Sequence, residues 1–358
     1  MLVFFRRFVF AFNLVAIILL GGAYLSAYIH PEEAWFFALL GLAYPFLVLL
    51  NVFFALFWFF QMKIKGFFSL GIILVGLNFM NASFQFKHKS EKSENAITIS
   101  SYNVGLFGYF QSKWHAPEMM SKINSINSDI LCVQEFLNVG TPGHSTLDSI
   151  KNACGFEHSY FQKLSDGRKR GEYGMAIFSK FPIEHSELVE FDGLTGNMCV
   201  IADIRIDTGL YRIYNVHLQS FKFKKQDYKF ITSPPDDNDE KIKQSKGLLG
   251  RMKSAYIKRA LQVGIIEEHI RRNESPYFII GDFNDPPVSY SYHTLSKGLK
   301  DAFIENGFGM GKTYTGLMPN FRIDYILYPE VFEGLDYKTY KLSSGHSLLT
   351  TVIKLKND

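Results

Sequence analysis

The chain has 358 residues, of which 47% are hydrophobic, and its formal net charge at neutral pH is +4. This near balance of charge excludes a uniformly basic nucleic-acid-binding protein. The three cysteines, Cys132, Cys154 and Cys199, are odd in number and widely spaced, which excludes a disulfide framework and a cysteine metal site and indicates core residues.

The first 85 residues are predicted to form a membrane anchor of about three transmembrane helices. Apolar stretches cover residues 8–29, 35–60 and 66–84. A helix needs about 20 apolar residues to cross a bilayer, and the first two stretches meet that length. The third is interrupted by Asn78 and Asn81, so a buried or interfacial helix stays open as an alternative. A second apolar stretch follows the first without a cleavage pattern, which favours a retained anchor over a signal peptide.

Charged residues beside the apolar stretches predict the orientation of the anchor. Arg6 and Arg7 precede the first stretch, and Lys63 and Lys65 separate the second from the third. The positive-inside rule places these residues in the cytoplasm. With three spans, the rest of the chain lies outside the cytoplasm, whereas two spans would reverse this. We therefore predict a multi-pass protein of a bacterial-type inner or plasma membrane with an extracytoplasmic C-terminal domain.

A short charged linker, residues 86–95, is predicted to precede one domain over residues 96–358. Alternating and continuous apolar runs predict strands at 97–103, 129–136, 173–183, 200–206, 211–218, 277–281, 322–327 and 347–355. Helical spacing predicts helices at 119–126 and 247–272. Strands outnumber helices, and hairpins mix with helix-linked pairs. This pattern favours packed sheets with helices outside over a doubly wound parallel sheet.

The segment IIGDFN, residues 279–284, is the most informative motif in the chain. Its apolar run suits a buried strand, and Gly281 lets the backbone turn so that Asp282 and Asn284 project from the strand end. Asp282 can bind a hard cation or orient a water, and the Asn284 amide can donate to a phosphate oxygen. A strand-end Asp-x-Asn can equally be a turn cap, so the motif needs support from the rest of the chain.

Several other predicted strands end in a polar residue. These residues are Asn103, Glu135, Asn215, His217, Asp324 and His346. Each alone has an ordinary structural explanation: Asp324, for example, could simply pair with Arg322, and a strand histidine is often a hydrogen-bonded core residue. Their presence together in one domain instead favours a shared site.

This set of segments resembles the endonuclease/exonuclease/phosphatase superfamily, most closely a membrane-anchored bacterial branch. The matching segments, in chain order, are SYNVGLF with Asn103, DILCVQEF with Glu135, YGMAIFSKFPI, YNVHLQS with His217, GDFND with Asp282 and Asn284, RIDYIL with Asp324, and SGHS with His346. The resemblance implies an α/β four-layer sandwich, in which two mainly antiparallel sheets pack face to face between helices. Here an all-α transmembrane segment would precede the sandwich.

Hydrolysis of phosphate esters is very slow without a catalyst, so the site must stabilise spreading negative charge and supply a poised water. A divalent cation, Mg²⁺ or Mn²⁺, would do the first, and we assign Glu135 and Asn103 to the metal. Asp282 and His346 are the two candidates for activating the water, with His346 held and charged by Asp324. The sequence does not decide between them.

Further residues are assigned to the substrate. Asn284 and His217 are expected to bind non-bridging phosphate oxygens, and His217 can also protonate the leaving group. Asn215 and Arg251 are additional candidates for substrate binding.

One position departs from the pattern of the superfamily. Its last motif is usually Ser-Asp-His, whereas Gly345 precedes His346 in this chain. The missing carboxylate normally binds metal or water, so we predict a single-metal site with reduced or altered activity.

The substrate is predicted from the segment at residues 221–259, which has 11 Lys and Arg against five Asp and Glu. Such a segment could follow a polyanion, with Phe221, Phe223 and Tyr228 stacking on bases, or it could be a solvated insertion. A nuclease is our first hypothesis, and a lipid headgroup phosphodiesterase or phosphatase is the second. A catalytically silent binding or scaffold protein, suggested by Gly345 alone, is the third. Nucleic acid is favoured over phospholipid, and no obligate protein partner is inferred.

Overall fold

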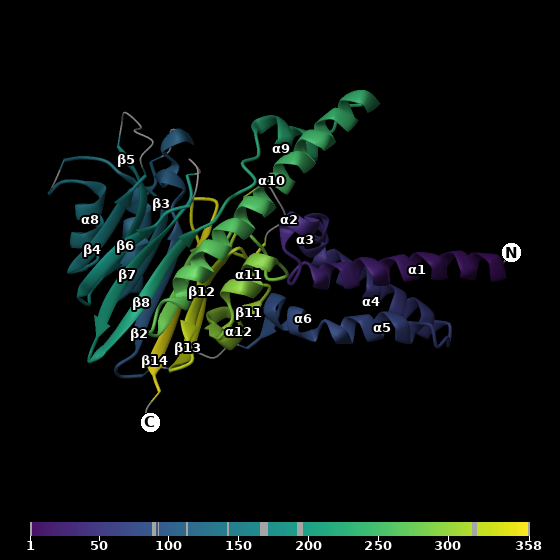
Figure 1. The fold of residues 1–358 in the computed structure, drawn as a ribbon, viewed down its shortest axis with the longest axis horizontal. Coiled ribbons are helices and arrows are strands. Elements are labelled where there is room, and N and C mark those ends of the chain that lie inside the picture. The colour runs from purple at the N-terminus through teal and green to yellow at the C-terminus, as the bar shows by residue number, and fades with distance from the viewer. Residues whose placement is uncertain are drawn as a thin grey trace. The chain divides into compact units, whose positions relative to one another are not determined.

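The computed structural model describes residues 2–87, 91, 93–111, 114–141, 143–164, 171–191, 196–316 and 321–356 (Figure 1). The chain forms two compact units. The first, called the anchor unit because it contains the predicted membrane anchor, comprises Met1–Ser83, Phe221–Leu261 and Asp285–Thr294. The second, called the sandwich unit, comprises Phe84–Ser220, Gln262–Asn284 and Leu295–Asp358. The sequence places a boundary near residue 85, but it does not predict that two later segments group with the anchor. Part of the predicted linker, residues 88–90 and 92, lies outside the described residues.

The anchor unit begins with six helices. They are α1 (Leu2–Leu25), α2 (Pro31–Ala34), α3 (Phe36–Leu42), α4 (Tyr44–Phe60), α5 (Gly66–Val75) and α6 (Leu77–Ser83). Within the described residues, the stretch Phe4–Leu25 of α1 is the one unbroken helix that is long and apolar enough to cross a membrane. Up to three helical segments qualify if α3 with α4, and α5 with α6, each count as a broken span.

The two later apolar stretches are bent, which corrects the expectation of continuous spans at residues 35–60 and 66–84. The chain bends by 67° between α3 and α4 and by 65° between α5 and α6. Pro45 stands in the first turn of α4 and has no backbone N–H to continue the hydrogen bonds of α3. Gly76 ends α5, and any residue with a Cβ at this position would overlap the Tyr24 ring. Composition alone shows the length of an apolar stretch and not these breaks.

Buried polar side chains link α1, α4 and α5. Asn13 Nδ2 donates to Ser69 Oγ at 2.6 Å, and Trp58 Nε1 donates to Asn13 Oδ1 at 2.9 Å. Asn51 Nδ2 donates to the Ala16 carbonyl at 3.0 Å. In a bilayer, hydrogen bonds of this kind hold helices together because lipid offers polar groups no partner. They fix the packing of these three helices.

The sandwich unit contains two six-stranded sheets, as the sequence predicts. The first has the order β10-β12-β9-β8-β7-β6 and the second β13-β14-β2-β3-β5-β4. Neighbouring strands run antiparallel except β8 with β9 and β2 with β3. The first sheet consists of β6 (Ile183–Val189), β7 (Met198–Ile206), β8 (Gly209–His217), β9 (Tyr277–Asp282), β10 (Leu299–Asp301) and β12 (Asp324–Pro329). The second consists of β2 (Ile97–Asn103), β3 (Ile130–Asn138), β4 (His158–Lys163), β5 (Glu172–Ser179), β13 (Phe332–Lys341) and β14 (Ser347–Leu355).

The main core lies between the two sheets. Alternate residues of each strand point inward, so Ile97 and Ile99 of β2 share one buried cluster with Phe278 and Ile280 of β9. A second cluster lies on the other face of β2 and β3. There Met119 of α7 (Ala116–Ile126) and residues of α8 (Thr146–Ala153) cover the sheet. The alternation therefore produces a sandwich whose sheets are buried on both faces.

The remaining elements belong to neither six-stranded sheet. They are β1 (Gln85–Phe86) paired with β11 (Phe308–Gly309), η1 (Gly105–Gln111), α9 (Lys225–Thr232), α10 (Asn238–Arg271), α11 (Tyr290–Leu295) and α12 (Ala302–Asn306). The long helix predicted at 247–272 is α10, which begins nine residues earlier and belongs to both units. Strands β4, β6 and β13 include many partly exposed residues, and none of the three was predicted from the sequence.

Candidate active site

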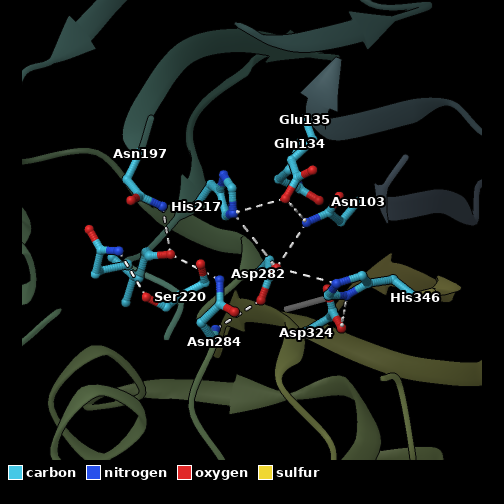
Figure 2. Close-up of polar contacts among 12 residues, drawn as sticks. Asn103, Gln134, Glu135, Asn197, His217, Ser220, Asp282, Asn284, Asp324 and His346 are labelled. Carbon is cyan, nitrogen blue, oxygen red and sulfur yellow. Dashed lines mark hydrogen bonds and ion pairs between the residues drawn. The ribbon is translucent and has the colours of Figure 1, made fainter. Parts of the chain in front are cut away.

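Strand register brings the predicted polar residues to one edge of the sandwich. In the first sheet, His217 at the end of β8 lies opposite Asp282 at the end of β9, and Asp324 at the start of β12 lies opposite Asp282 on the other side. In the second sheet, Asn103 ends β2 next to β3, which carries Glu135. Figure 2 shows these side chains, together with His346, pointing toward one another.

Asp282 lies at the centre of the cluster and is only 1% exposed. Its Oδ2 accepts a hydrogen bond from Asn103 Nδ2 at 2.9 Å and lies 3.8 Å from Nε2 of both His217 and His346. Its Oδ1 accepts a hydrogen bond from the Asn284 backbone N–H at 2.8 Å. One carboxylate therefore contacts four residues that come from separate segments of the chain (Figure 2).

The backbone at the site adopts conformations that few residues tolerate. Gly281 has a φ of 138°, and a Cβ there would overlap the Val216 carbonyl oxygen, so glycine is needed for β9 to approach β8. Glu135 and Asn284 have φ values of 49° and 53°. Left-handed backbone at non-glycine residues costs of order 1–3 kcal/mol and is common at functional sites.

A bulge in β3 directs Glu135 into the cluster. The pairing of β3 with β5 shifts register between Val133 and Phe136, which is where Glu135 adopts its left-handed conformation. Glu135 Oε1 accepts a hydrogen bond from Asn103 Nδ2 at 3.3 Å and lies 3.6 Å from His217 Nε2. About a third of the Glu135 side chain is exposed, compared with almost none of Asp282 or Asp324.

His346 and Asp324 form a buried pair. His346 Nδ1 lies 3.1 Å from both carboxylate oxygens of Asp324. Burial by itself would lower the pKa of His346, but the negative charges of Asp324 and Asp282 outweigh burial and raise the pKa to about 10. The pair orients the ring so that its other nitrogen, Nε2, faces Asp282. In the metal-free protein, His346 is therefore a charged donor at neutral pH.

Burial raises the pKa of Asp282, and the neighbouring charge of Asp324 raises it further. The neighbouring rings of His346 and His217 and the hydrogen bond from Asn103 oppose this rise. A carboxylate whose pKa is shifted upward binds a proton more readily than an ordinary aspartate. Asp282 is thus suited to accept a proton at this site.

The residues present suit a hard divalent cation. Glu135, Asp282 and Asp324 bring three carboxylates to one place, and Mg²⁺ and Mn²⁺ prefer such oxygen ligands. Asp282, Asp324 and His346 also offer ligand atoms that all lie within 4.8 Å of one another. Asn103 uses its Nδ2 to hold two of the carboxylates, and its Oδ1 accepts from the Gly105 N–H at 3.0 Å. In this arrangement Asn103 orients the carboxylates.

Two of the predicted substrate-binding residues have their described contacts with other groups. Asn215 is fully buried, accepts a hydrogen bond from Gln134 Nε2 at 2.7 Å and donates to the Ala176 carbonyl at 3.0 Å. Its amide joins the two sheets inside the core, which favours a structural role. Arg251 belongs to the anchor unit and pairs there with Asp227. The contacts of Asn215 place it in the core of the sandwich unit, and the role of Arg251 in substrate binding stays a prediction.

Sequence reasoning missed the contacts that hold Asn284. Asn284 Nδ2 donates to the Leu218 carbonyl at 2.9 Å, and the same carbonyl accepts from Asn197 Nδ2 at 2.7 Å (Figure 2). Asn197 is buried and immediately precedes β7. In the sequence, the available signal was a polar residue just before a predicted strand. These bonds fix the loop after β9 to the end of β8.

The chain belongs to the endonuclease/exonuclease/phosphatase family, whose model matches residues 100–336. Members of this family are hydrolases of phosphoester bonds and generally use divalent metal ions. A second family model, described as a domain of unknown function (DUF8431), matches residues 6–83. A search of curated proteins found no match.

Solved structures with the same fold share little sequence with this chain. An endonuclease/exonuclease/phosphatase from Bacteroides vulgatus superposes with a TM-score of 0.53 at 14% identity, over 74% of this chain and all of that one. One from Beutenbergia cavernae gives 0.52 at 14% identity, over 74% and 72% of the two chains. The catalytic domain of human Nocturnin with bound sulfate gives 0.52 at 15% identity, over 75% and 97%. At these identities the likeness supports the fold alone.

Proposed function

We propose that this protein is a membrane-anchored, divalent-metal-dependent phosphodiester hydrolase whose substrate is a nucleic acid. The convergence of Asn103, His217, Asn284 and His346 on the buried carboxylate of Asp282 is the observation that carries the proposal. Hydrolysis of a phosphodiester needs a proton acceptor beside cationic and amide donors, and the cluster has both.

In this proposal Asp282 takes the proton from the attacking water, because His346 already carries a proton at neutral pH. His346, held by Asp324, and His217 stabilise negative charge on the phosphate, and Asn284 orients one of its oxygens. Glu135, with Asn103 orienting it, would hold Mg²⁺ or Mn²⁺, which supplies electrostatic stabilisation of the phosphate when bound.

We further propose that the anchor crosses the membrane three times and that the sandwich unit lies outside the cytoplasm. The hydrogen bonds among Asn13, Ser69 and Trp58 support three packed membrane helices, since α4 and α5 both bond to α1. The basic residues Arg6 and Arg7 near the start of α1, and Lys63 and Lys65 before α5, support the orientation. A reporter enzyme that is active on only one side of the membrane, fused after Asp358, tests on which side the sandwich unit lies.

The basic segment after β8 supports a nucleic-acid substrate. Lys222, Lys224 and Lys225 follow His217 within eight residues, and their side chains are at least partly exposed. Cations so close in sequence to a phosphate-binding residue would add affinity for a polyanion and make it salt-dependent.

A lipid headgroup phosphodiester is the second candidate substrate, and a different observation favours it. The segment that begins directly after Asn284 belongs to the anchor unit, where the Val288 carbonyl accepts a hydrogen bond from Ser26 Oγ at 2.9 Å. Ser26 follows directly on α1, so this segment of the chain lies beside the first membrane helix.

The full chain in lipid nanodiscs should be incubated with DNA, RNA, sphingomyelin and phosphoinositides, each with Mg²⁺, Mn²⁺ or EDTA. We expect metal-dependent cleavage that is lost in Asp282→Asn and kept in Glu184→Gln, a change at an exposed surface pair with Arg205. Cleavage of lipid but not nucleic acid would select the second candidate. Turnover that is insensitive to EDTA, or none on any substrate, would contradict the proposed function.

A further inference from the structure

The loop that carries Asn284 continues directly into the anchor unit. The chain leaves the sandwich unit between Asn284 and Asp285 and returns to it at Leu295. Asn284 has a left-handed backbone with a φ of 53°, and its side chain is tied to the Leu218 carbonyl. A residue in such a conformation holds it only if its neighbours are fixed. The placement of Asp285 therefore bears directly on Asn284.

A buried ion pair fixes Asp285. Arg259 of α10 is fully buried, and its Nη1 lies 2.5 Å from Asp285 Oδ1. The other oxygen of Asp285 accepts a hydrogen bond from Ser291 Oγ at 2.8 Å. The Arg259 guanidinium also lies 5.2 Å and 5.4 Å from the ring centroids of Phe221 and Tyr256. A buried charge is tolerated only when paired in good geometry, so both ends of this pair have defined positions.

Three residues further on, the chain inserts among the membrane helices. Val288 is 2% exposed and packs with Leu20 and Tyr44 of the anchor. Ser26 Oγ donates to the Val288 carbonyl across 262 residues of sequence. Gly41 of α3 lies against both groups, and a Cβ at Gly41 would overlap the Ser26 hydroxyl and the Val288 carbonyl oxygen. Glycine at position 41 thus allows Val288 to reach its site.

We propose that the anchor is part of the catalytic machinery, with Ser26, Gly41 and Arg259 acting as positioning residues for Asn284 through residues 285–288. The anchor then does more than tether the protein. Gly41 contacts the hydrogen-bonded carbonyl of Val288, and residues 285–288 connect that carbonyl to the proposed phosphate-binding amide of Asn284. The catalytic part of this inference depends on the proposed role of Asn284 in phosphate binding.

The sharpest test compares two glycines of the anchor in the full chain in nanodiscs. Gly41→Ala places a methyl group against Val288, whereas Gly71→Ala in α5 meets nothing within 4 Å and serves as the matched control. With bis(4-nitrophenyl) phosphate and Mg²⁺, we expect Gly41→Ala to lower kcat/KM by on the order of tenfold or more, because small displacements at a site have large effects. Gly71→Ala should match wild type.

A second readout does not depend on activity. Hydrogen–deuterium exchange of peptides covering residues 279–292 should be faster in Gly41→Ala than in Gly71→Ala and wild type, while peptides from β2 and β14 stay unchanged. If the three proteins show this pattern of exchange but the wild type hydrolyses no substrate, the proposed function fails and the structural inference stands. Equal exchange and equal kcat/KM in both alanine variants would overturn the inference.

A milder variant covers the case in which Gly41→Ala does not fold. Ser26→Ala removes only the hydroxyl that donates to Val288, and the loss of one hydrogen bond predicts a decrease in kcat/KM of about two- to tenfold. Arg259→Lys keeps the charge but not the planar fork of donors, and should raise exchange at residues 279–292 in the same way. Wild-type exchange in both of these variants would also contradict the proposal.

Discussion

Asp324 and Asp282 are directly opposite each other in neighbouring antiparallel strands, and His346 binds the first through Nδ1 and faces the second through Nε2. Two carboxylates so close together repel each other, and the imidazolium between them offsets that repulsion. Burial and the charge of Asp324 raise the pKa of Asp282, and the charges of both carboxylates raise the pKa of His346 to about 10. The first two predictions test this three-residue arrangement.

Replacing Asp324 with Asn should remove the charge that keeps His346 protonated and oriented. We expect kcat to fall by about 100-fold or more, as for loss of a general acid–base group, with a smaller change in KM. Steady-state kinetics on the full chain measure this effect. Asp336→Asn, at a buried carboxylate of β13 that pairs with Lys338, is the control and should keep kcat near wild type.

The raised pKa of His346 predicts how stability depends on pH in the metal-free protein. The unfolded pKa is about 6.5 and the folded pKa about 10, so folding favours the protonated ring. The stabilisation is complete below about pH 6.5 and is lost as the pH rises through 10. Thermal unfolding midpoints of wild type and His346→Gln, measured with EDTA, should therefore converge as the pH rises. Midpoints that diverge as the pH rises would contradict the predicted loss of stabilisation by His346 at high pH.

Gly345→Asp should restore the carboxylate that the superfamily usually has before the histidine. A Cβ at Gly345 meets nothing within 4 Å, so there is space for the side chain. Its φ of 90° is unfavourable for other residues, and the change should cost about 1–3 kcal/mol of stability.

We expect Gly345→Asp to increase Mg²⁺ affinity or turnover and to lower the unfolding midpoint. Gly345→Ala carries the same backbone strain without a carboxylate, so it measures the decrease in the unfolding midpoint alone. If aspartate and alanine give the same metal affinity and the same turnover, position 345 does not contribute a ligand.

Glu135→Gln should weaken Mg²⁺ binding, because an uncharged amide is a poorer ligand for a hard cation than a carboxylate. We expect a decrease in affinity of roughly 10- to 100-fold, the size of effect seen when the surroundings of a metal are altered. Isothermal titration calorimetry of the full chain with MgCl₂ measures it. Glu187→Gln, at a partly exposed glutamate of β6, should bind as wild type does. Unchanged affinity in Glu135→Gln would remove Glu135 from the metal site.

Local pattern was sufficient to predict much of the sandwich. β2 and β14 begin and end where the sequence predicts, because apolar residues repeat along them and turn residues flank them. The cluster around Asp282 was also predictable, since strand-end polar residues in α/β proteins often gather at one edge. The partly exposed strands β4, β6 and β13 show weaker patterns and were missed.

Other features depend on contacts that no local pattern reveals. Asn215 has a polar side chain at a strand end, yet its partners are Gln134 and a carbonyl of β5, so it lies in the core. The bulge at Glu135 depends on the register of β3 against β5. The grouping of residues 285–294 with the anchor rests on Ser26 and Arg259, which are distant in sequence.

The hydrogen bonds of Asn13 have a consequence for replacing the anchor. Its amide donates a hydrogen bond to α5 and accepts one from α4, so both helices are needed to satisfy this polar side chain of α1. If α1 crosses a bilayer as we propose, a shortened protein that keeps α1 alone would expose this amide to hydrocarbon tails, where it has no partner. Exchanging the first helix for an unrelated hydrophobic one would also leave the indole N–H of Trp58 without its acceptor, Asn13 Oδ1. The three helices therefore depend on one another, and a protein with an exchanged anchor should carry all of them.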